Sequence, residues 1–315
     1  MKKSNLIKNN GFSIIIIIMI TYVGIVLYSD INKISSIFYN IKYEFLVIII
    51  GLQMISFSLR SYRQKKFLES SGIKLSFWEN FKICLAGMSM IVTPGGAGML
   101  IKSHFLKRKY GFSVSRTAPM ILAERYHDFL AVTTILLLSL IVVFSIHVVI
   151  SGTVALILLF LVYLIIRNHD WLEKFEQKII RKKIFQKIFP SDLNISDSVN
   201  SLKTPRIIGF GWIISTILWI IDAFAIFFGF VALGVDIGVV ESIQIFFSSL
   251  IYGIISFLPA GIGVTEGIFI GLLLKHDVKL SIATALILFI RLTTVWFLTF
   301  VGFVTMKFFL GNEKT

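Results

Sequence analysis

Long apolar runs dominate this chain, and they most strongly constrain what it can fold into. The runs are about 17 to 27 residues long, which is typical of α-helices that cross a bilayer, whereas a membrane β-strand needs only about 10 alternating residues. In lipid, each spanning helix must satisfy its own backbone hydrogen bonds. We therefore predict an all-α polytopic membrane protein, with residues 1–315 forming a single integral membrane domain.

The apolar runs differ in continuity. Two stretches, 80–101 and 239–275, are interrupted by Pro and Gly, and neither half of either stretch reaches the length of about 20 residues that crosses a bilayer comfortably. We predict that both are re-entrant hairpins that are buried in protein or line a cavity, because broken backbone cannot face lipid. The uninterrupted runs predict six full transmembrane helices, at 12–28, 44–59, 119–145, 148–166, 207–233 and 280–306.

The two broken stretches share a motif. Residues 94–98 (Pro-Gly-Gly-Ala-Gly) and 259–263 (Pro-Ala-Gly-Ile-Gly) both read Pro-x-Gly-x-Gly. An arginine follows each motif at a similar distance, Arg125 after the first and Arg291 after the second. A Gly-rich break followed by a charge inside an apolar helix, occurring twice, indicates an internally duplicated membrane protein with a polar site.

The distribution of charge predicts the orientation of the spans. The formal net charge is +14, but Lys and Arg collect between the spans, which is typical of cytoplasmic loops and not of a nucleic-acid-binding surface. The basic segments 60–79, 102–116 and 167–206 are expected in the cytoplasm, and the weakly charged loops 29–43 and 234–241 outside. We expect 61–79 and 167–206 to form short interfacial helices and loops.

This orientation gives the two halves opposite topologies. The first hairpin enters from the cytoplasm and the second from outside, so residues 1–145 and 146–315 are predicted to form an inverted 3+3 repeat. We expect a multi-pass protein of the plasma membrane with cytoplasmic N- and C-termini.

Charged side chains within the apolar helices mark the candidate site, because a charge at mid-bilayer costs about 2.5–3.5 kcal/mol. We predict that Arg125 and Arg291 are anion ligands. For Glu124, Asp128 and Asp222, two interpretations stay open: a proton relay, or structural ion pairs. The structural alternatives are an ion-pair cluster within the helix around Arg125 and a pair between Asp222 and Arg291.

The glycines of the two motifs are candidate anion ligands through their backbone N–H groups. Glu266 follows the second motif and is expected to begin a half-helix or to take up a proton. The alternative for the glycines is close packing between helices. The candidate substrate-binding glycines are Gly95, Gly96, Gly98, Gly261 and Gly263.

The sequence contains no nucleophile-and-base motif, no phosphate-binding Walker loop and no His-Glu-x-x-His motif, so we expect no catalytic residues. The single cysteine, Cys84, excludes an internal disulfide and a cysteine-based metal site. Glu124-x-x-His127 is half of a di-iron ligand set without a second half. We expect no metal and no cofactor.

From about Leu59 to Gly302, the chain resembles the flippase-like membrane family. This family comprises the transmembrane region of lysylphosphatidylglycerol synthetases and its stand-alone relatives, and includes the membrane part of some archaeal dolichol-sugar glycosyltransferases. The residues that carry the resemblance are the Gly motif at 94–98, Glu124-Arg125-x-x-Asp128, Leu258 with the motif at 259–263, Glu266, and Arg291.

The resemblance implies a protein that moves a phospholipid or polyprenyl-phosphate lipid between leaflets, with a phosphate head group as its ligand. Family members often have Glu at the position of Met99 and Arg at that of Lys102, so a head-group contact of Lys102 is an expectation only. The soluble aminoacyl-transferase domain is not in this chain, and lysyl transfer is not implied. The alternatives are a membrane enzyme or enzyme subunit in envelope lipid or glycan synthesis, with a glycosyltransferase or lipid-synthesis partner, and a secondary solute transporter.

Overall fold

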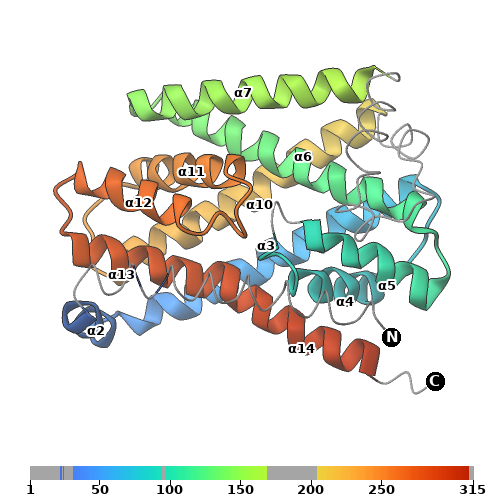
Figure 1. Cartoon of the computed structure of the whole chain (residues 1–315), viewed down its shortest axis with the longest axis horizontal. Helices are drawn as coiled ribbons and strands as arrows, with labels where there is room; N and C mark the ends of the chain where they lie inside the picture. Colours follow the sequence, from blue (N-terminus) through green and yellow to red (C-terminus); the bar gives the residue numbers. More distant parts are fainter. Residues whose placement is uncertain (1–21, 23, 25–30, 94–96, 169–203, 312–315) are drawn as a thin grey trace.

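The computed structural model describes Tyr22, Gly24 and residues 31–93, 97–168 and 204–311. Within these residues the regular elements are all helices, which confirms the helical class (Figure 1). Four helices are long and apolar enough to cross a membrane: α3 (Tyr43–Ser70), α7 (Ile146–Arg167), α10 (Pro205–Ala232) and the continuous run Leu280–Phe308. That run comprises α13 (Leu280–Arg291), the π-helical turn η4 (Leu292–Trp296) and the first part of α14 (Phe297–Gly311).

The other two predicted spans are not among these four helices. The span at 119–145 corresponds to α6 (Val114–Ser139), whose charged side chains set it apart from the four apolar helices. It starts five residues earlier than we predicted, because Pro119 is accommodated inside its second turn, where the missing N–H removes only one helical hydrogen bond. The predicted span 12–28 and the predicted interfacial segment 167–206 lie largely outside the described residues.

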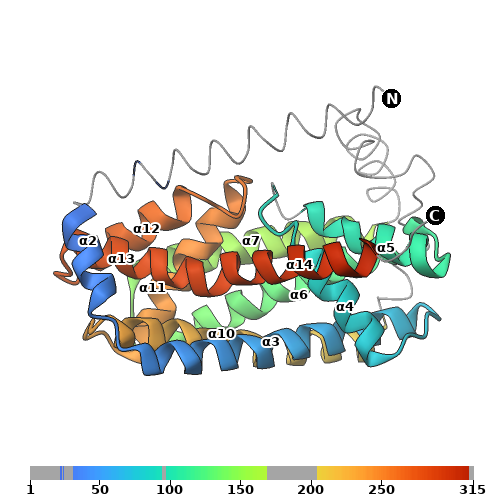
Figure 2. The same cartoon turned by 90° about the horizontal axis from the view of Figure 1, so that it is seen from below.

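Both interrupted stretches form two helices around a break. The first consists of α4 (Phe77–Met88), the short turn η1 (Ala97–Leu100) and α5 (Ile101–Tyr110). The second consists of α11 (Val239–Ile255) and α12 (Val264–Leu274). Figures 1 and 2 show that α5 returns to the end of the molecule from which α4 starts, and that α12 returns to the opposite end beside α11. The two breaks therefore lie toward the middle of the molecule.

Local sequence signals explain where these helices start and stop. Ser76 and Glu79 form a reciprocal capping box that starts α4. Gly111 ends α5 with a φ of 76°, and Gly263 starts α12 with a φ of 88°. Both values lie in the left-handed region that glycine adopts without strain.

Helices α3 and α10 form an antiparallel pair along their length. The N–H of Lys42 donates to the carbonyl of Ala232 (3.2 Å) at one end, and Gln53 donates to Asp222 (3.3 Å) farther along.

The halves also exchange contacts through their later helices. Helix α14 packs on α4 so closely that a Cβ at Gly302 would lie 2.6 Å from both the Leu85 carbonyl oxygen and the Ser89 nitrogen. Helix α6 packs on α11, where Gln244 donates to the hydroxyl of Ser139 (3.1 Å). In both cases, the long helix after one break contacts the helix that precedes the break in the other half.

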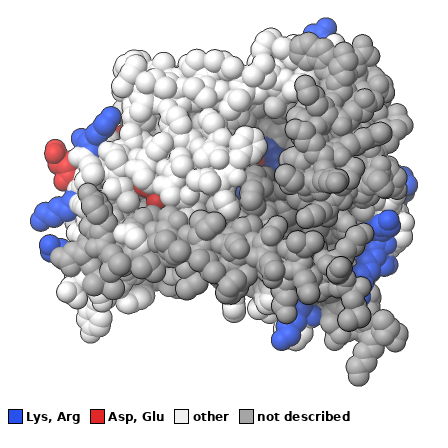
Figure 3. Space-filling view, in the orientation of Figure 1, with Lys and Arg blue, Asp and Glu red and all other residues white. Residues whose placement is uncertain are grey.

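Two predictions about loops were wrong. Residues 61–70 do not form a separate interfacial segment after a span that ends at residue 59, because α3 continues through them to Ser70 and buries Arg63 against α6 and α10. The segment 29–43 contains a short helix, α2 (Ile31–Tyr39). The described Lys and Arg side chains in Figure 3 lie mostly toward the two ends of the molecule, and the described surface between them is largely uncharged apart from a few charged atoms near a central hollow.

Candidate functional site

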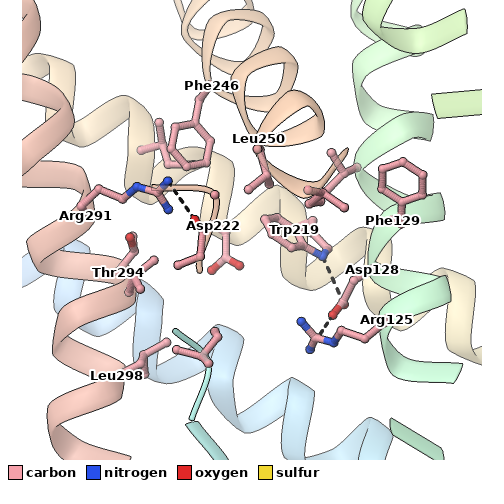
Figure 4. Close-up of a pocket in the computed structure, with 18 of the residues that line it drawn as sticks. Arg125, Asp128, Phe129, Trp219, Asp222, Phe246, Leu250, Arg291, Thr294 and Leu298 are labelled. Atoms are coloured by element: carbon pink, nitrogen blue, oxygen red, sulfur yellow. Dashed lines mark hydrogen bonds and ion pairs between the residues drawn. The ribbon is translucent and has the colours of Figure 1, made fainter. Parts of the chain in front are cut away.

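A cavity of about 300 Å³ lies where the two breaks approach each other (Figure 4). Ile91 lines it from the first break, and Leu258, Ala260 and Gly261 line it from the second. The middle parts of α3, α6, α10 and the Leu280–Phe308 run complete its wall. Most lining side chains are apolar.

The charged side chains that line the cavity come from four different helices. Figure 4 shows Arg291 on one side and Arg125, Asp128 and Trp219 on the other. Among the described residues, the charged lining side chains are Arg60 of α3, Arg125 and Asp128 of α6, Asp222 of α10 and Arg291 of α13. Arg60 and Arg291, which are 231 positions apart in the sequence, therefore line the same cavity.

Asp128 is the centre of one cluster on this wall. Its Oδ1 accepts from Arg63 Nη1 (2.7 Å) and from Trp219 Nε1 (3.2 Å), and its Oδ2 lies 2.9 Å from Arg125 Nη2. Arg60 Nη1 lies 3.5 Å from Oδ1. The predicted ion pair between Arg125 and Asp128 within α6 therefore forms, but α3 adds two further guanidinium groups to it.

Asp222 belongs to the same cluster through Arg60. Arg60 Nη2 donates to Asp222 Oδ2 (2.5 Å), and Gln53 donates to its Oδ1 (3.3 Å). The guanidinium carbon of Arg60 also lies 4.9 Å from the centre of the Trp219 ring, a cation–π contact. The alternative interpretation, in which Asp222 pairs with Arg291, is wrong, because Asp222 pairs with Arg60.

Arg291 pairs with Glu266. Its Nε donates to Glu266 Oε1 (2.8 Å) and its Nη2 to the carbonyl of Ala260 (3.1 Å). The other carboxylate oxygen of Glu266 accepts the N–H of Gly263 (2.6 Å), and the hydroxyl of Tyr22 donates to Oε1 (3.3 Å). Glu266 thus holds the start of α12 against α13, at the third position of its half-helix, as the sequence predicts.

The first half has a corresponding ion pair with the opposite polarity. Lys102 of α5 lies 2.8 Å from Glu124 of α6 and also donates to Gln64 (2.9 Å). Gln64 in turn donates to Asn80 of α4 (2.8 Å). In each half, the helix after the break is therefore joined to the following long helix by a buried ion pair. Lys102 and Glu124 do not line the cavity, whereas Arg291 does.

Three N–H groups of the second Gly motif have partners inside the protein. Gly261 donates to the Leu258 carbonyl (3.0 Å) and Ile262 to the Pro259 carbonyl (3.0 Å), and Gly263 donates to Glu266. Ala260 and Gly261 have φ values of 51° and 67°, so the chain turns tightly here. Binding of an anion by these amides stays a prediction that requires the break to rearrange.

Close packing accounts for part of the second motif. A Cβ at Gly253 would lie 2.0 Å from Thr265 Oγ1, and a Cβ at Gly261 would lie 2.8 Å from the Gly253 Cα. In the first motif, Gly95 and Gly96 lie outside the described residues, and the N–H of Gly98 donates to Thr93 Oγ1 (2.6 Å).

Sequence reasoning missed the contribution of α3. Gln53, Ser56, Arg60 and Arg63 follow one another at spacings of three or four residues, which places them on one face of a helix. That polar stripe is the available sequence signal, but its basic residues also fit an interfacial segment after the span. Trp219 gave no sequence signal, because its role depends on the approach of α3 and α6.

The described residues contain no group of three or more His, Cys, Asp and Glu side chains arranged to hold a metal ion. The charged groups that line the cavity are instead guanidinium groups, each paired with a carboxylate. Such an arrangement can bind an anion through charge-assisted hydrogen bonds.

Comparison with known proteins agrees with this architecture. The family described as "Lysylphosphatidylglycerol synthase TM region" matches residues 12–302. A UPF0104 membrane protein of Pyrococcus horikoshii is 26% identical over 329 aligned residues, covering 96% of this chain and 97% of that protein. A UPF0104 membrane protein of Methanothermobacter thermautotrophicus is 22% identical over 327 aligned residues, covering 96% of each.

Proposed function

Because the chain belongs to the lysylphosphatidylglycerol synthase TM-region family, we propose that it binds the phosphate group of a membrane lipid in the central cavity and moves that lipid between leaflets. The lipid is a phospholipid or a polyprenyl-phosphate-linked lipid. The observation that carries this proposal is the cavity between the two breaks, with three guanidinium groups in its wall.

The position of the cavity supports translocation. It lies toward the middle of a molecule whose long helices are long enough to cross a bilayer, so a head group in it would be partway between the leaflets. Transporters commonly bind their substrates near the bilayer midplane, at discontinuous helices. The breaks between α4 and α5 and between α11 and α12 fit that pattern.

An inverted repeat supports alternating access. We infer that α3 to α6 correspond to α10 to α14, with both hairpins re-entrant from opposite sides. The antiparallel pairing of α3 with α10, the reciprocal packing of α14 on α4 and α6 on α11, and the matching buried ion pairs all favour this arrangement. Rocking of one half against the other would then expose the cavity to each side in turn.

The orientation completes this scheme. The ends of α3, α5 and α7 carry the basic segments and would face the cytoplasm, with both termini on that side of the plasma membrane. The apolar tail of the lipid needs a way out of the cavity into the bilayer. Ile254 and Leu258 line the cavity and are also 45% and 43% exposed at the surface, which makes the α11–α12 break the candidate lateral opening.

A head-group translocation assay in proteoliposomes tests the proposal. We expect the wild-type protein to move a labelled phospholipid, and the Arg125→Ala and Arg291→Ala variants to lose about tenfold or more in rate, because a charge-assisted hydrogen bond contributes about 1.5–3 kcal/mol. Arg116→Ala is the matched control, since Arg116 is exposed at the start of α6, where its guanidinium group donates to the carbonyl of Ser71. Unchanged rates in both cavity variants would refute the phosphate-binding role.

The same vesicles separate the alternative functions. A translocator returns the lipid chemically unchanged, which mass spectrometry of the extracted lipid can establish. A modified lipid, with or without an added glycosyltransferase or lipid-synthesis partner, would instead support a membrane enzyme or enzyme subunit. Uptake of a soluble anion without lipid movement would support a secondary solute transporter.

A further inference from the structure

We propose that the π-helical turn η4 (Leu292–Trp296) is a hinge, at which the second hairpin (α11 and α12) together with α13 moves relative to the first hairpin (α4, η1 and α5) together with α14. The inference rests on the proposed function for the purpose of this movement, which is to open and close the cavity between the two breaks. The hinge itself follows from the backbone of the turn and from the elements that pack on either side of it.

The turn η4 interrupts a run that is otherwise α-helical from Leu280 to Gly311. The N–H of Phe297 donates to the carbonyl of Leu292, five residues earlier, whereas an α-helix pairs each N–H with the carbonyl four residues earlier. Turns of this kind are rare, occur mostly as single turns inside α-helices and lie frequently at functional sites. They are also one of the few places where a helix changes direction sharply, so η4 is the part of this run that bends most easily.

The side chains of the turn suit a backbone that bends. The turn contains neither Pro nor Gly but has three consecutive β-branched residues, Thr293, Thr294 and Val295, which favour an α-helix less than unbranched residues do. The hydroxyls of Thr293 and Thr294 both donate to the carbonyl of Ile290 (3.2 and 2.6 Å). In a membrane, such hydroxyls satisfy carbonyl groups whose helical partners are displaced. They therefore support the backbone when the turn changes its angle.

Helix α13, before the turn, is joined to the second hairpin. Arg291 pairs with Glu266 of α12 and also donates to the carbonyl of Ala260 in the break. Helix α13 also packs on α10, where a Cβ at Gly229 would lie 3.3 Å from Ile290. The last residue before η4 is therefore fixed to the second half of the chain.

Helix α14, after the turn, is joined to the first hairpin. It packs on α4, where a Cβ at Gly302 would overlap backbone atoms of Leu85 and Ser89, and the hydroxyl of Ser89 donates to the sulfur of Met306 (3.7 Å). Backbones in such close contact cannot slide past each other without separating, so α14 moves together with α4. Relative movement of the two hairpins must then be taken up between Arg291 and Gly302, where η4 lies.

The hinge forms part of the cavity wall. Thr294 and Val295 of the turn line the cavity, as do Arg291 before it and Leu298 after it. Figure 4 shows Arg291, Thr294 and Leu298 along one wall, with Trp219 across the cavity from them. A bend at η4 moves Arg291 relative to Leu298, so it changes the shape of the cavity. A ligand that fits one of these shapes better shifts the hinge toward that position.

Tyr22 bridges the hinge. Its hydroxyl accepts a hydrogen bond from Nε1 of Trp296, the last residue of η4 (3.3 Å), and donates to Glu266 Oε1 (3.3 Å). The rings of Tyr22 and Trp296 also meet edge to face, with their centres 6.0 Å apart. Glu266 is fixed to Arg291 just before the turn, so Tyr22 connects the two ends of η4 and holds the turn in its present conformation.

The test is the distance between two spin labels in proteoliposomes, measured by pulsed electron paramagnetic resonance. Labels at His104→Cys in α5 and Phe257→Cys in the second break report on the two hairpins, since both native side chains are exposed. Labels at Phe257→Cys and Leu274→Cys both lie in the second hairpin and form the reference pair. We expect a broad or two-component distance distribution for the first pair and a single narrow one for the reference pair. A first pair as narrow as the reference pair would overturn the proposal.

Deletion of Leu292 removes the hinge. A π turn contains one residue more than an α-helical turn, so the deletion should restore a regular α-helix without rotating α14 relative to α13. The Leu292 side chain is 57% exposed, and Leu292→Ala is the matched control because it keeps the turn. We expect a single narrow distance between positions 104 and 257 in the deletion variant and the wild-type distribution in Leu292→Ala. A folded deletion variant with the wild-type distribution would contradict the assignment of the hinge to η4.

Tyr22→Phe loosens the hinge. It keeps the ring but removes both hydrogen bonds of the hydroxyl, so the distance distribution between positions 104 and 257 should broaden or shift. Tyr39→Phe makes the same change at a side chain that is 84% exposed and should leave the distribution unchanged. If the Leu292 deletion variant does not fold, these two variants decide, and equal distributions in both would overturn the proposal.

The hinge and the proposed function can fail separately. If the hinge serves translocation, the Leu292 deletion variant should lose most of the lipid movement that Leu292→Ala retains. A rigid deletion variant that moves lipid at the wild-type rate would overturn the role of the hinge while the translocator remains. Distances that depend on η4, in a wild-type protein that moves no lipid, would support the hinge and refute the proposed function.

Discussion

Glu266 and Arg291 form a buried ion pair, with Arg291 Nε 2.8 Å from Glu266 Oε1, and this pair joins the half-helix after the second break to the last long helix. Lys102 and Glu124 make the same connection in the first half with the charges exchanged. Each half therefore has a buried ion pair that joins the helix after its break to the next long helix. The positive residue lies on the long helix in the second half and on the helix after the break in the first.

Removal of one member of the second pair should strongly destabilise the protein. We expect Glu266→Gln to lower the free energy of unfolding by about 3–5 kcal/mol, because it leaves Arg291 buried without its counter-charge. The measurement is denaturant unfolding in detergent micelles. Glu69→Gln is the control, since it breaks the partly exposed pair with Lys66 and should cost no more than about 1 kcal/mol. Equal losses in the two variants would contradict a structural role for the Glu266–Arg291 pair.

The close packing of Gly253 against Thr265 predicts that alanine substitutions at two glycines differ in their effect on stability. Gly253→Ala should destabilise the protein by about 1–3 kcal/mol, because the added methyl group would overlap Thr265 Oγ1. Gly267→Ala, on the open side of α12 with no atom within 4 Å of the new Cβ, should be neutral or stabilising by up to about 1 kcal/mol. Thermal unfolding of both variants checks the order. A more stable Gly253→Ala protein would mean that the break is not packed in this way.

Loss of the Asp128 carboxylate should lower the free energy of unfolding by more than loss of one half of a simple ion pair. Asp128→Asn would leave the guanidinium groups of Arg60, Arg63 and Arg125 with only Asp222 as counter-charge, so we expect a loss of about 3 kcal/mol or more in the free energy of unfolding. The same substitution at exposed Asp236 should have little effect. Added phosphatidylglycerol should recover part of the loss in the Asp128→Asn protein, since a bound anion replaces the missing charge. No difference between the two variants would contradict the cluster.

The proposed inverted repeat predicts that the connections after the two hairpins lie on opposite sides of the membrane. The native Cys84 is buried, so single cysteines introduced at exposed Ser113 and His276 can be labelled separately. In intact cells, an impermeant reagent should label His276→Cys and should reach Ser113→Cys only after the membrane is opened. Labelling of both positions from the same side would rule out the inverted arrangement.

Much of this fold is predictable from the sequence, because lipid imposes a length and a polarity on each spanning helix. The apolar runs predict the bounds of α7 and α10 to within two residues at each end. The Pro and Gly residues of both interrupted stretches correctly predict a break in each. The end of α3 was not found. The sequence alone does not show that Arg60 and Arg63 lie in a helix, because basic residues are also typical of loops. Their burial depends on ion pairs with Asp222 of α10 and Asp128 of α6, which are distant in the sequence.

The same limit applies to the site. Intramembrane charges identified Arg125, Asp128, Asp222 and Arg291, all of which line the cavity. Their pairing depends on which helices touch, and nothing in a linear sequence decides whether Asp222 faces Arg291 or Arg60. Glu124 looks like a site residue for the same reason and Lys102 through the family resemblance, but packing of α5 on α6 places both away from the cavity.

We propose above that a lipid phosphate occupies the cavity between the two breaks. The most direct measurement is an electron cryo-microscopy map of the full chain in nanodiscs that contain phosphatidylglycerol, where a complex with a bound antibody fragment supplies enough mass for alignment. The account predicts head-group density in the cavity with phosphate oxygens about 3 Å from the guanidinium of Arg125, and loss of that density in Arg125→Gln. Lipid density confined to the outer surface of the helices, with an unchanged cavity in both proteins, would contradict it.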